Sequence, residues 1–306
     1  MNNRIIELGN SGINEGKGKR MDRHIILLVS KPFNFPARQP INQSTNQLVN
    51  LSTSQLVNQS TNQPIMQPIK RICLWSGPRN MSTAFMYSWA QRPDTVVVDE
   101  PLYGYYLEKT GIVHPGREEV MASMDCDRDR VVAQMITGTY DGPLVFFKHM
   151  AHHMVEVDYE MMAPLHNLFF IRNPRQVLTS YAEVITNPVS EDVGIEKQYE
   201  LYRYALERGY KVWVLDSGQL LQNPAEVLKK LCAAMEIPFY ECMLHWQAGA
   251  RSEDGIWAKY WYTNVHRSTR FAPQKEDERA LPAHLEPLCR QLQPVYDKLL
   301  EVSIKV

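Results

Sequence analysis

Two short segments of this sequence carry residues suited to binding anions. The first, Ser76 to Thr83, contains one arginine and ends in two hydroxyl side chains. The second, Arg172 to Tyr181, begins with an arginine and has a serine, Ser180, eight residues later. Each follows a short apolar run and precedes an amphipathic stretch, so each is predicted to join a strand to a helix. Helix N-termini, hydroxyls and guanidinium groups bind phosphate-like groups. Two such loops predict a ligand with two separated anionic groups.

The first loop superficially resembles the phosphate loop of ATP-binding proteins, but it lacks the Gly-Lys pair that such loops need. Ser82 and Thr83 stand in those positions, and Asp99 is the nearest candidate for a magnesium-holding partner. For either hydroxyl alone, a simple helix N-cap is an alternative. A transferable group that needs no metal fits better, so no metal site is predicted. The candidate binding residues of this loop are Gly77, Pro78, Arg79, Asn80, Met81, Ser82 and Thr83.

Candidate proton acceptors follow a third apolar run. Residues 144–147 lead into Lys148, and His149, His152 and His153 come next. A neutral imidazole accepts a proton near pH 7, so any of the three could act as a general base beside an active-site lysine. We prefer His152 and His153, because adjacent histidines can point one into a cleft and one toward a supporting partner. A structural role is the alternative for each, and their spacing matches no metal-binding pattern.

Two acidic residues, Asp99 and Glu100, follow the apolar run 95–98. They could orient a polar or cationic group of a small-molecule acceptor, whose pocket we expect along residues 103–136. Glu100 could equally serve only to cap a helix that begins at Pro101. The acceptor itself and the oligomeric state are left open.

The pattern of short apolar runs alternating with longer amphipathic stretches predicts an α/β fold. Alternation of this kind gives a three-layer arrangement in which a mostly parallel central sheet is covered by helices on both faces. Ligands of such sheets bind at the carboxyl ends of the strands, where both loops fall. We predict strands at 71–75, 95–98, 144–147, 167–171 and 211–215, and helices at 82–90, 118–136, 175–184, 195–207 and 224–235, the last with Asn223 as cap and Pro224 at its first position.

The first 65 residues differ in composition from the rest of the chain. Residues 42–65 form an eight-residue repeat rich in Asn, Gln, Ser and Thr, which has too few apolar side chains to offset the entropy of ordering. We therefore expect residues 1–65 to be a disordered tail and residues 66–306 to be the functional domain. Stacking of the repeat as β-structure is the alternative. We also hypothesise that Met66 is the native start.

Charge and cysteine content exclude some partners. Residues 66–306 carry 26 Lys and Arg against 31 Asp and Glu, which argues against a nucleic-acid binder. The five cysteines have no paired or metal-ligand spacing and fit a reducing cytoplasm, and Cys73 and Cys232 are predicted to be core residues. The apolar run 24–29 is too short to span a membrane, so no membrane partner is expected.

The two loops resemble the motifs of the sulfotransferase superfamily, whose first motif is P-K-S-G-T-T or P-R-S-G-T-T. The segment 78–83 matches it except for Met81, where glycine is usual. The second motif, R-N-P-x-D-x-x-x-S-Y, is similar to residues 172–181 except for Gln176. A third likeness covers residues 212–239, so the resemblance extends from about 71 to 239. It implies a P-loop-like fold and transfer of a sulfuryl group from 3′-phosphoadenosine 5′-phosphosulfate (PAPS) to a hydroxyl or amine, without metal.

The resemblance also implies a role for each motif residue. The first loop would hold the 5′-phosphosulfate, and Arg79 would stabilise charge on the bridging oxygen as the sulfuryl group leaves. Arg172 and Ser180 would hold the 3′-phosphate, which remains on the product adenosine 3′,5′-bisphosphate. The alternative for Arg172 is a surface arginine at a strand end. The family usually places its base two residues after the lysine, but Met150 stands there in this chain.

A closer likeness is to a sulfotransferase-like subgroup with similar segments at residues 99–103, 148–153 and 257–269. Members of that subgroup sometimes carry a branched-chain aminotransferase-like label, because plant relatives are fused to an aminotransferase. We expect too few residues after Phe239 for a pyridoxal-phosphate fold. The alternatives to a sulfotransferase are a P-loop phosphotransferase or hydrolase, and a binding protein that keeps the nucleotide cleft without turnover.

Overall fold

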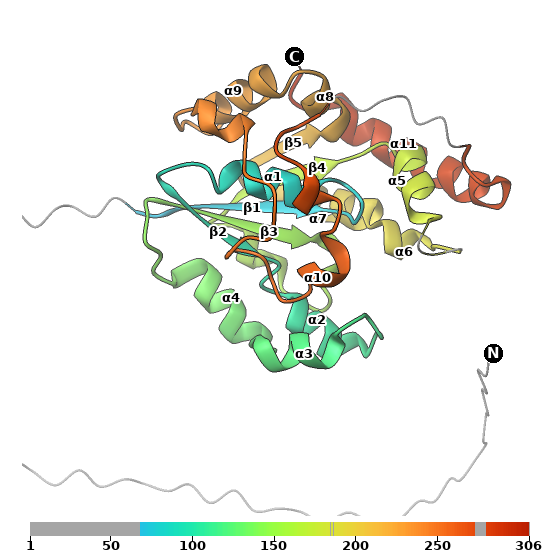
Figure 1. The fold of residues 1–306 in the computed structure, drawn as a ribbon, viewed down its shortest axis with the longest axis horizontal. Helices are drawn as coiled ribbons and strands as arrows, with labels where there is room; N and C mark the ends of the chain where they lie inside the picture. The colour runs from blue at the N-terminus through green and yellow to red at the C-terminus, as the bar shows by residue number, and fades with distance from the viewer. Residues whose placement is uncertain (1–67, 184, 186, 273–279, 306) are drawn as a thin grey trace, which may run out of the picture. The chain divides into compact units, whose positions relative to one another are not determined.

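A parallel five-stranded sheet forms the centre of the protein in a computed structural model that describes residues 68–183, 185, 187–272 and 280–305 (Figure 1). The strand order is β2-β3-β1-β4-β5, and every neighbouring pair is parallel. The expectations for residues 1–65 lie outside the described residues. The strands are β1 (Lys70–Ser76), β2 (Thr95–Asp99), β3 (Leu144–Met150), β4 (His166–Ile171) and β5 (Val212–Asp216).

All five predicted strands are confirmed, because runs of Val, Ile, Leu and Phe that are buried on both faces are typical of parallel sheets. The predicted helix 118–136 is instead two helices, α3 and α4, since Asp127 caps α4 by accepting a hydrogen bond from the Arg130 backbone N–H. The longer helices are α1 (Ser82–Trp89), α2 (Tyr103–Thr110), α3 (Arg117–Ser123), α4 (Arg128–Thr137), α5 (Pro174–Tyr181), α7 (Ile195–Glu207), α9 (Pro224–Ala234) and α11 (Glu286–Glu301). The shorter ones are α6 (Ser190–Val193), α8 (Ser217–Gln222), α10 (Ala258–Trp261) and the 3₁₀ turn η1 (Ala151–His153).

The predicted cap of α9 is confirmed. The Asn223 side chain accepts a hydrogen bond from the Glu226 backbone N–H, and Pro224 is at the first turn. Both Cys73 and Cys232 are buried in the core, as predicted, and all five cysteines are free thiols.

The two faces of the sheet bury separate apolar clusters. On one face Ile72, Leu74 and Phe146 pack with α1, α8 and α9, and on the other Trp75 and Phe147 pack with α4, α5, α7 and α11. Side chains alternate along a strand, so each strand supplies both clusters. The predicted three-layer α/β fold is therefore confirmed. No helix in the described part of the chain is both long and apolar enough to cross a membrane.

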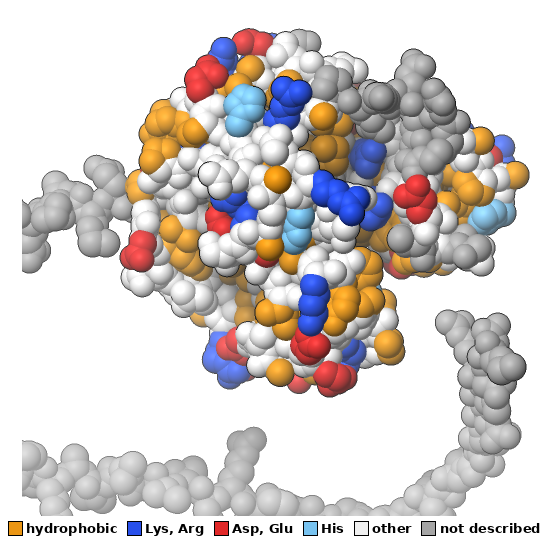
Figure 2. All heavy atoms as spheres, in the orientation of Figure 1, with side chains coloured by type: hydrophobic (Ala, Val, Ile, Leu, Met, Phe, Trp, Pro, Cys, Tyr) orange, Lys and Arg blue, Asp and Glu red, His pale blue; other side chains and the backbone are white. Residues whose placement is uncertain are grey.

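The surface carries charges of both signs. On the face in Figure 2, Lys and Arg side chains are dispersed among apolar, acidic and uncharged groups.

Phe146 tests the packing of the α1 face of the sheet. Its ring is fully buried and stacks on Trp89 with centroids 4.7 Å apart. We expect Phe146→Ala to lower the free energy of unfolding by about 3 to 5 kcal/mol through the cavity it leaves. Leu206→Ala, at a position 52% exposed on α7, is the matched control and should change it by less than about 0.5 kcal/mol. Urea unfolding measures both, and equal effects would contradict this account of the core.

Candidate active site

The first loop is held against its neighbours at both of its ends. A Cβ on Gly77 would lie 2.4 Å from the Val193 carbonyl oxygen, so only glycine fits against the end of α6. Asn80 is buried, and its side-chain amide donates to the Phe170 carbonyl of β4. The loop between β1 and α1 is thereby fixed to the next strand of the sheet.

The backbone of this loop leaves the N-terminus of α1 open. Arg79 and Met81 have φ values of 58° and 62°, in the left-handed region that glycine adopts most readily. This backbone explains why glycine is usual at the position of Met81. Met81 is also the N-cap of α1 and makes no side-chain capping bond, so the capping alternative for Ser82 and Thr83 is wrong. The first N–H groups of a helix have no intrahelical partner, and left-handed residues at such a loop are typical of anion sites.

The second loop meets the first at the ends of β1 and β4. The Arg79 Nε donates to the Ser180 hydroxyl over 2.9 Å, and an Arg172 guanidinium N–H donates to the Arg79 carbonyl over 2.5 Å. Asn173 caps α5 and Pro174 opens it, which directs the helix so that Ser180 faces the first loop. The structure thus brings together the three polar residues that were assigned to two phosphate-like groups.

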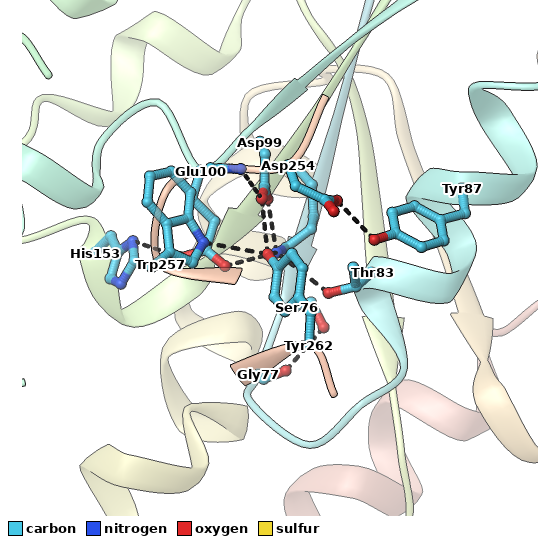
Figure 3. Close-up of polar contacts among 12 residues, drawn as sticks. Ser76, Gly77, Thr83, Tyr87, Asp99, Glu100, His153, Asp254, Trp257 and Tyr262 are labelled. Atoms are coloured by element: carbon cyan, nitrogen blue, oxygen red, sulfur yellow. Dashed lines mark hydrogen bonds and ion pairs between the residues drawn. The ribbon is translucent and has the colours of Figure 1, made fainter. Parts of the chain in front are cut away.

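Lys148 is the centre of a second, buried part of the site (Figure 3). Its side chain is fully buried, and its ammonium donates to Asp99 Oδ1 at 2.7 Å, Glu100 Oε1 at 2.6 Å and Tyr262 Oη at 2.6 Å. The Thr83 hydroxyl of α1 lies 3.5 Å from the same nitrogen. The lysine therefore connects the ends of β2 and β3, the first loop and the segment around α10.

Tyr262 ties the C-terminal segment to this cluster. Its hydroxyl donates to Asp99 Oδ2 at 2.7 Å and accepts from the indole N–H of Trp257 at 3.2 Å. Nearby, the Tyr87 hydroxyl of α1 donates to Asp254 at 2.6 Å. Tyr262 and Trp257 are both buried.

Burial and charge shift the titration of this cluster. Burial by itself lowers the pKa of a lysine, but the carboxylates of Asp99 and Glu100 hold the pKa of Lys148 well above its usual value. Burial raises the pKa of Glu100, and it raises the pKa of Tyr262 well above the usual value. Lys148 is accordingly a charged lysine at neutral pH.

The three histidines lie in different surroundings. Because side chains alternate along β3, His149 is on the opposite face of the sheet from Lys148, where it stacks on Trp75. A Cβ on Gly194 would lie 3.7 Å from His152 Nδ1 and 3.6 Å from Gly77 Cα, so His152 is beside the first loop.

His153 is buried and stacks on Tyr103 and Tyr106, with Nδ1 3.9 Å from Glu100 Oε2. Burial lowers the pKa of His149 to about 3 and that of His152 to about 4, and it holds the pKa of His153 well below its usual value. All three are consequently neutral imidazoles at physiological pH.

Comparisons with known proteins identify the family of this chain. A model described as the sulfotransferase domain matches residues 70–299, which include both loops and the buried cluster. The chain belongs to the sulfotransferase family.

Two curated relatives from Arabidopsis thaliana support the subgroup expected from the sequence. They are branched-chain-amino-acid aminotransferase-like proteins 1 and 2, 38% and 34% identical over 227 and 226 residues. Each alignment covers 74% of this chain and 40% of the relative, so the sulfotransferase domain spans less than half the length of these relatives.

Among solved structures, the sulfotransferase domain of the Synechococcus PCC 7002 olefin synthase is similar in fold. The TM-score is 0.50 at 17% identity, and the similarity covers 76% of this chain and 95% of that domain. In the described part of the chain, no group of three or more His, Cys, Asp or Glu side chains is placed to hold a metal ion.

Sequence reasoning missed the pairing of Lys148 with its carboxylates. It noted Asp99 and Glu100, but as groups free to orient an acceptor. The available signal was the pair of acidic residues at the end of one apolar run and a lysine at the end of another. Only the register of β2 with β3, which sets Asp99 beside Lys148, makes them partners.

The buried histidines predict acid sensitivity. Unfolded histidine binds a proton below pH about 6.5, whereas native His149 stays neutral to about pH 3, so stability falls as the pH drops below 6.5. By pH 5 the loss from His149 is about 2 kcal/mol. We expect His149→Phe, which keeps the stacking on Trp75, to remove that part of the loss. The exposed His245→Gln is the control, and urea unfolding between pH 8 and 5 measures it. The same acid limb in the parent and in His149→Phe would refute the assignment.

Proposed function

We propose that this domain is a PAPS-dependent sulfotransferase that moves a sulfuryl group to a hydroxyl or amine of a small acceptor. The observation that carries the proposal is the meeting of Arg79, Arg172 and Ser180 beside the open N-terminus of α1. A single phosphate needs one such site. A ligand with a 5′-phosphosulfate and a 3′-phosphate needs two neighbouring ones, and these residues supply them.

The residues present fit this co-substrate. The N–H groups of the first loop and the hydroxyls of Ser82 and Thr83 would hold the 5′-phosphosulfate, while Arg172 and Ser180 would hold the 3′-phosphate. Arg79 would stabilise charge on the oxygen that leaves with adenosine 3′,5′-bisphosphate. Lys148 also contacts Thr83, but its charge is already paired with Asp99 and Glu100, so the cations for the donor are Arg79 and Arg172. The chain thus offers arginine side chains and backbone N–H groups to the anionic ligand, without the lysine of ATP-binding phosphate loops.

The acceptor would bind beside the buried cluster, next to the first loop. There Glu100 pairs with Lys148, the Trp257 indole donates to Tyr262, and the rings of Tyr103 and Trp257 pack edge to face. A site with carboxylates and neutral aromatic groups suits an uncharged or cationic acceptor better than an anionic one, since it disfavours added negative charge.

Nucleotide binding can be tested without knowing the acceptor. We expect adenosine 3′,5′-bisphosphate, at a hundredfold excess over its dissociation constant, to stabilise the full chain by about 2.7 kcal/mol, which is roughly 5 to 10 °C in thermal unfolding. ATP with magnesium is the comparison and should give a much smaller shift. A shift with magnesium ATP alone would return the chain to the phosphotransferase class.

A variant of Arg172 tests whether the 3′-phosphate is bound by a specific contact or only by the positive charge of the loop. Arg172→Ala should weaken binding of the bisphosphate by about 1.5 to 3 kcal/mol, because a charge-assisted contact is lost. The matched control is Arg175→Ala on the same loop and helix, where the guanidinium pairs with Glu286 at 2.8 Å and is half-exposed. Titration calorimetry compares the two. Equal affinities for both variants and the parent would remove Arg172 from the site.

A further inference from the structure

Glu100 occupies a strained position at the carboxyl end of β2. Its φ is 41°, in the left-handed region, and its side chain is only 8% exposed. Its backbone N–H donates to the Lys148 carbonyl at 2.8 Å, and its carbonyl accepts from the Tyr103 N–H at 2.9 Å. Non-glycine residues keep such a backbone only where the surroundings hold it, and such positions cluster at active sites. The strain directs the carboxylate toward the end of β3.

The two oxygens of this carboxylate differ. Oε1 accepts from the Lys148 ammonium at 2.6 Å, which fixes the side chain. Among the described residues Oε2 makes no hydrogen bond, and His153 Nδ1 lies 3.9 Å from it. An ionised carboxylate oxygen without a partner can accept a hydrogen bond or a proton. The second oxygen is therefore available to a bound group.

The position of Glu100 relates it to the anion loop. The ammonium that binds Oε1 also lies 3.5 Å from the hydroxyl of Thr83, the second residue of α1. One lysine side chain thus spans from the carboxylate to the loop proposed to hold the donor (Figure 3). A nucleophile bound at Oε2 would stand next to that loop.

The histidines are less suited to take the proton. His149 is on the other face of the sheet, stacked on Trp75. His153 is near, but it is enclosed between aromatic rings, and burial holds its pKa well below the usual value. The same burial raises the pKa of Glu100, which brings a carboxylate closer to the range of a general base.

We infer that Glu100 Oε2 is the proton acceptor of the reaction, with Lys148 as its positioning residue; this inference rests on the proposed function. The acceptor O–H or N–H bond breaks and its proton passes to Oε2. The acceptor lone pair forms the new bond to sulfur while the bond from sulfur to the bridging oxygen breaks. That electron pair stays on the 5′-phosphate of adenosine 3′,5′-bisphosphate. The carboxylic acid then returns its proton to water.

The pH dependence of this step reflects every charged or titratable group that faces Glu100. Burial and the Asp99 charge raise the pKa of Glu100, and the Lys148 charge lowers it. The base works when ionised, so turnover should fall as the pH drops through a value above that of an ordinary glutamate. The groups facing Glu100 are Lys148 on β3, Asp99 on β2, Tyr103 on α2, His153 on η1 and Tyr262 after α10.

The test is Glu100→Gln in the full chain, with release of sulfate from PAPS to water as the readout. We expect kcat to fall about 100-fold or more, because general base catalysis is worth about 10² to 10⁴, and the acid limb of the pH profile to disappear. The KM for PAPS and the thermal shift with adenosine 3′,5′-bisphosphate should stay unchanged. A merely structural role would alter stability or KM and leave the acid limb in place.

Two further variants keep the test decisive if Glu100→Gln does not fold. Glu100→Asp retains a base and should keep the acid limb at lower kcat. Asp99→Asn removes a neighbouring negative charge and should move the limb to lower pH. The inference is overturned if Glu100→Gln keeps the kcat of the parent or keeps the fall of kcat at acid pH. It is also overturned if this fall occurs at the same pH in Asp99→Asn as in the parent. The inference is also overturned if the parent chain binds adenosine 3′,5′-bisphosphate but releases no sulfate, although the nucleotide site would then stand. If the parent chain does not bind the bisphosphate, the proposed function itself is refuted.

Discussion

The buried ammonium of Lys148 is the interaction on which the rest of the site depends. A lone charge inside a protein is very costly, whereas a charge that is paired and fully hydrogen-bonded is tolerated. The adjacent Asp99 and Glu100 and the distant Tyr262 direct their oxygens at this one nitrogen. The ends of β2 and β3 and the segment after α10 are thereby held together. Three partners at 2.6 to 2.7 Å match the three protons of the ammonium, so the contacts of Lys148 organise the site.

The same cluster gives the site two electrically different ends. Arg79 and Arg172 stand at one end, with the open N-terminus of α1, and two carboxylates share a single lysine at the other. Both groups lie at the carboxyl edge of one parallel sheet, which is where ligands of such sheets bind. The proposed transfer uses this polarity, with the anionic donor at the first end and the acceptor at the second.

Local sequence pattern was sufficient for the strands and for the two strand-to-helix loops, because apolar runs and Pro174 act over a few positions. It was insufficient for anything that depends on which strands are neighbours. Asp99 and Lys148 are partners only because β2 pairs with β3, and Tyr262 reaches them from more than a hundred residues along the chain. The helix predicted over 118–136 failed for a local reason, since Asp127 provides a second helix start that the periodic pattern concealed.

The three histidines show how a small error in the predicted end of a strand changes which side chains are assigned to the site. The sequence pattern ended the third strand at residue 147, but β3 continues to Met150, so alternation turns His149 away from Lys148. Burial then acts on the remaining groups in opposite directions. It lowers the pKa of His152 and His153 and raises that of Glu100, because in each case it disfavours the charged form. The apolar surroundings that weaken an imidazole as a base strengthen a carboxylate, which favours Glu100 over the histidines.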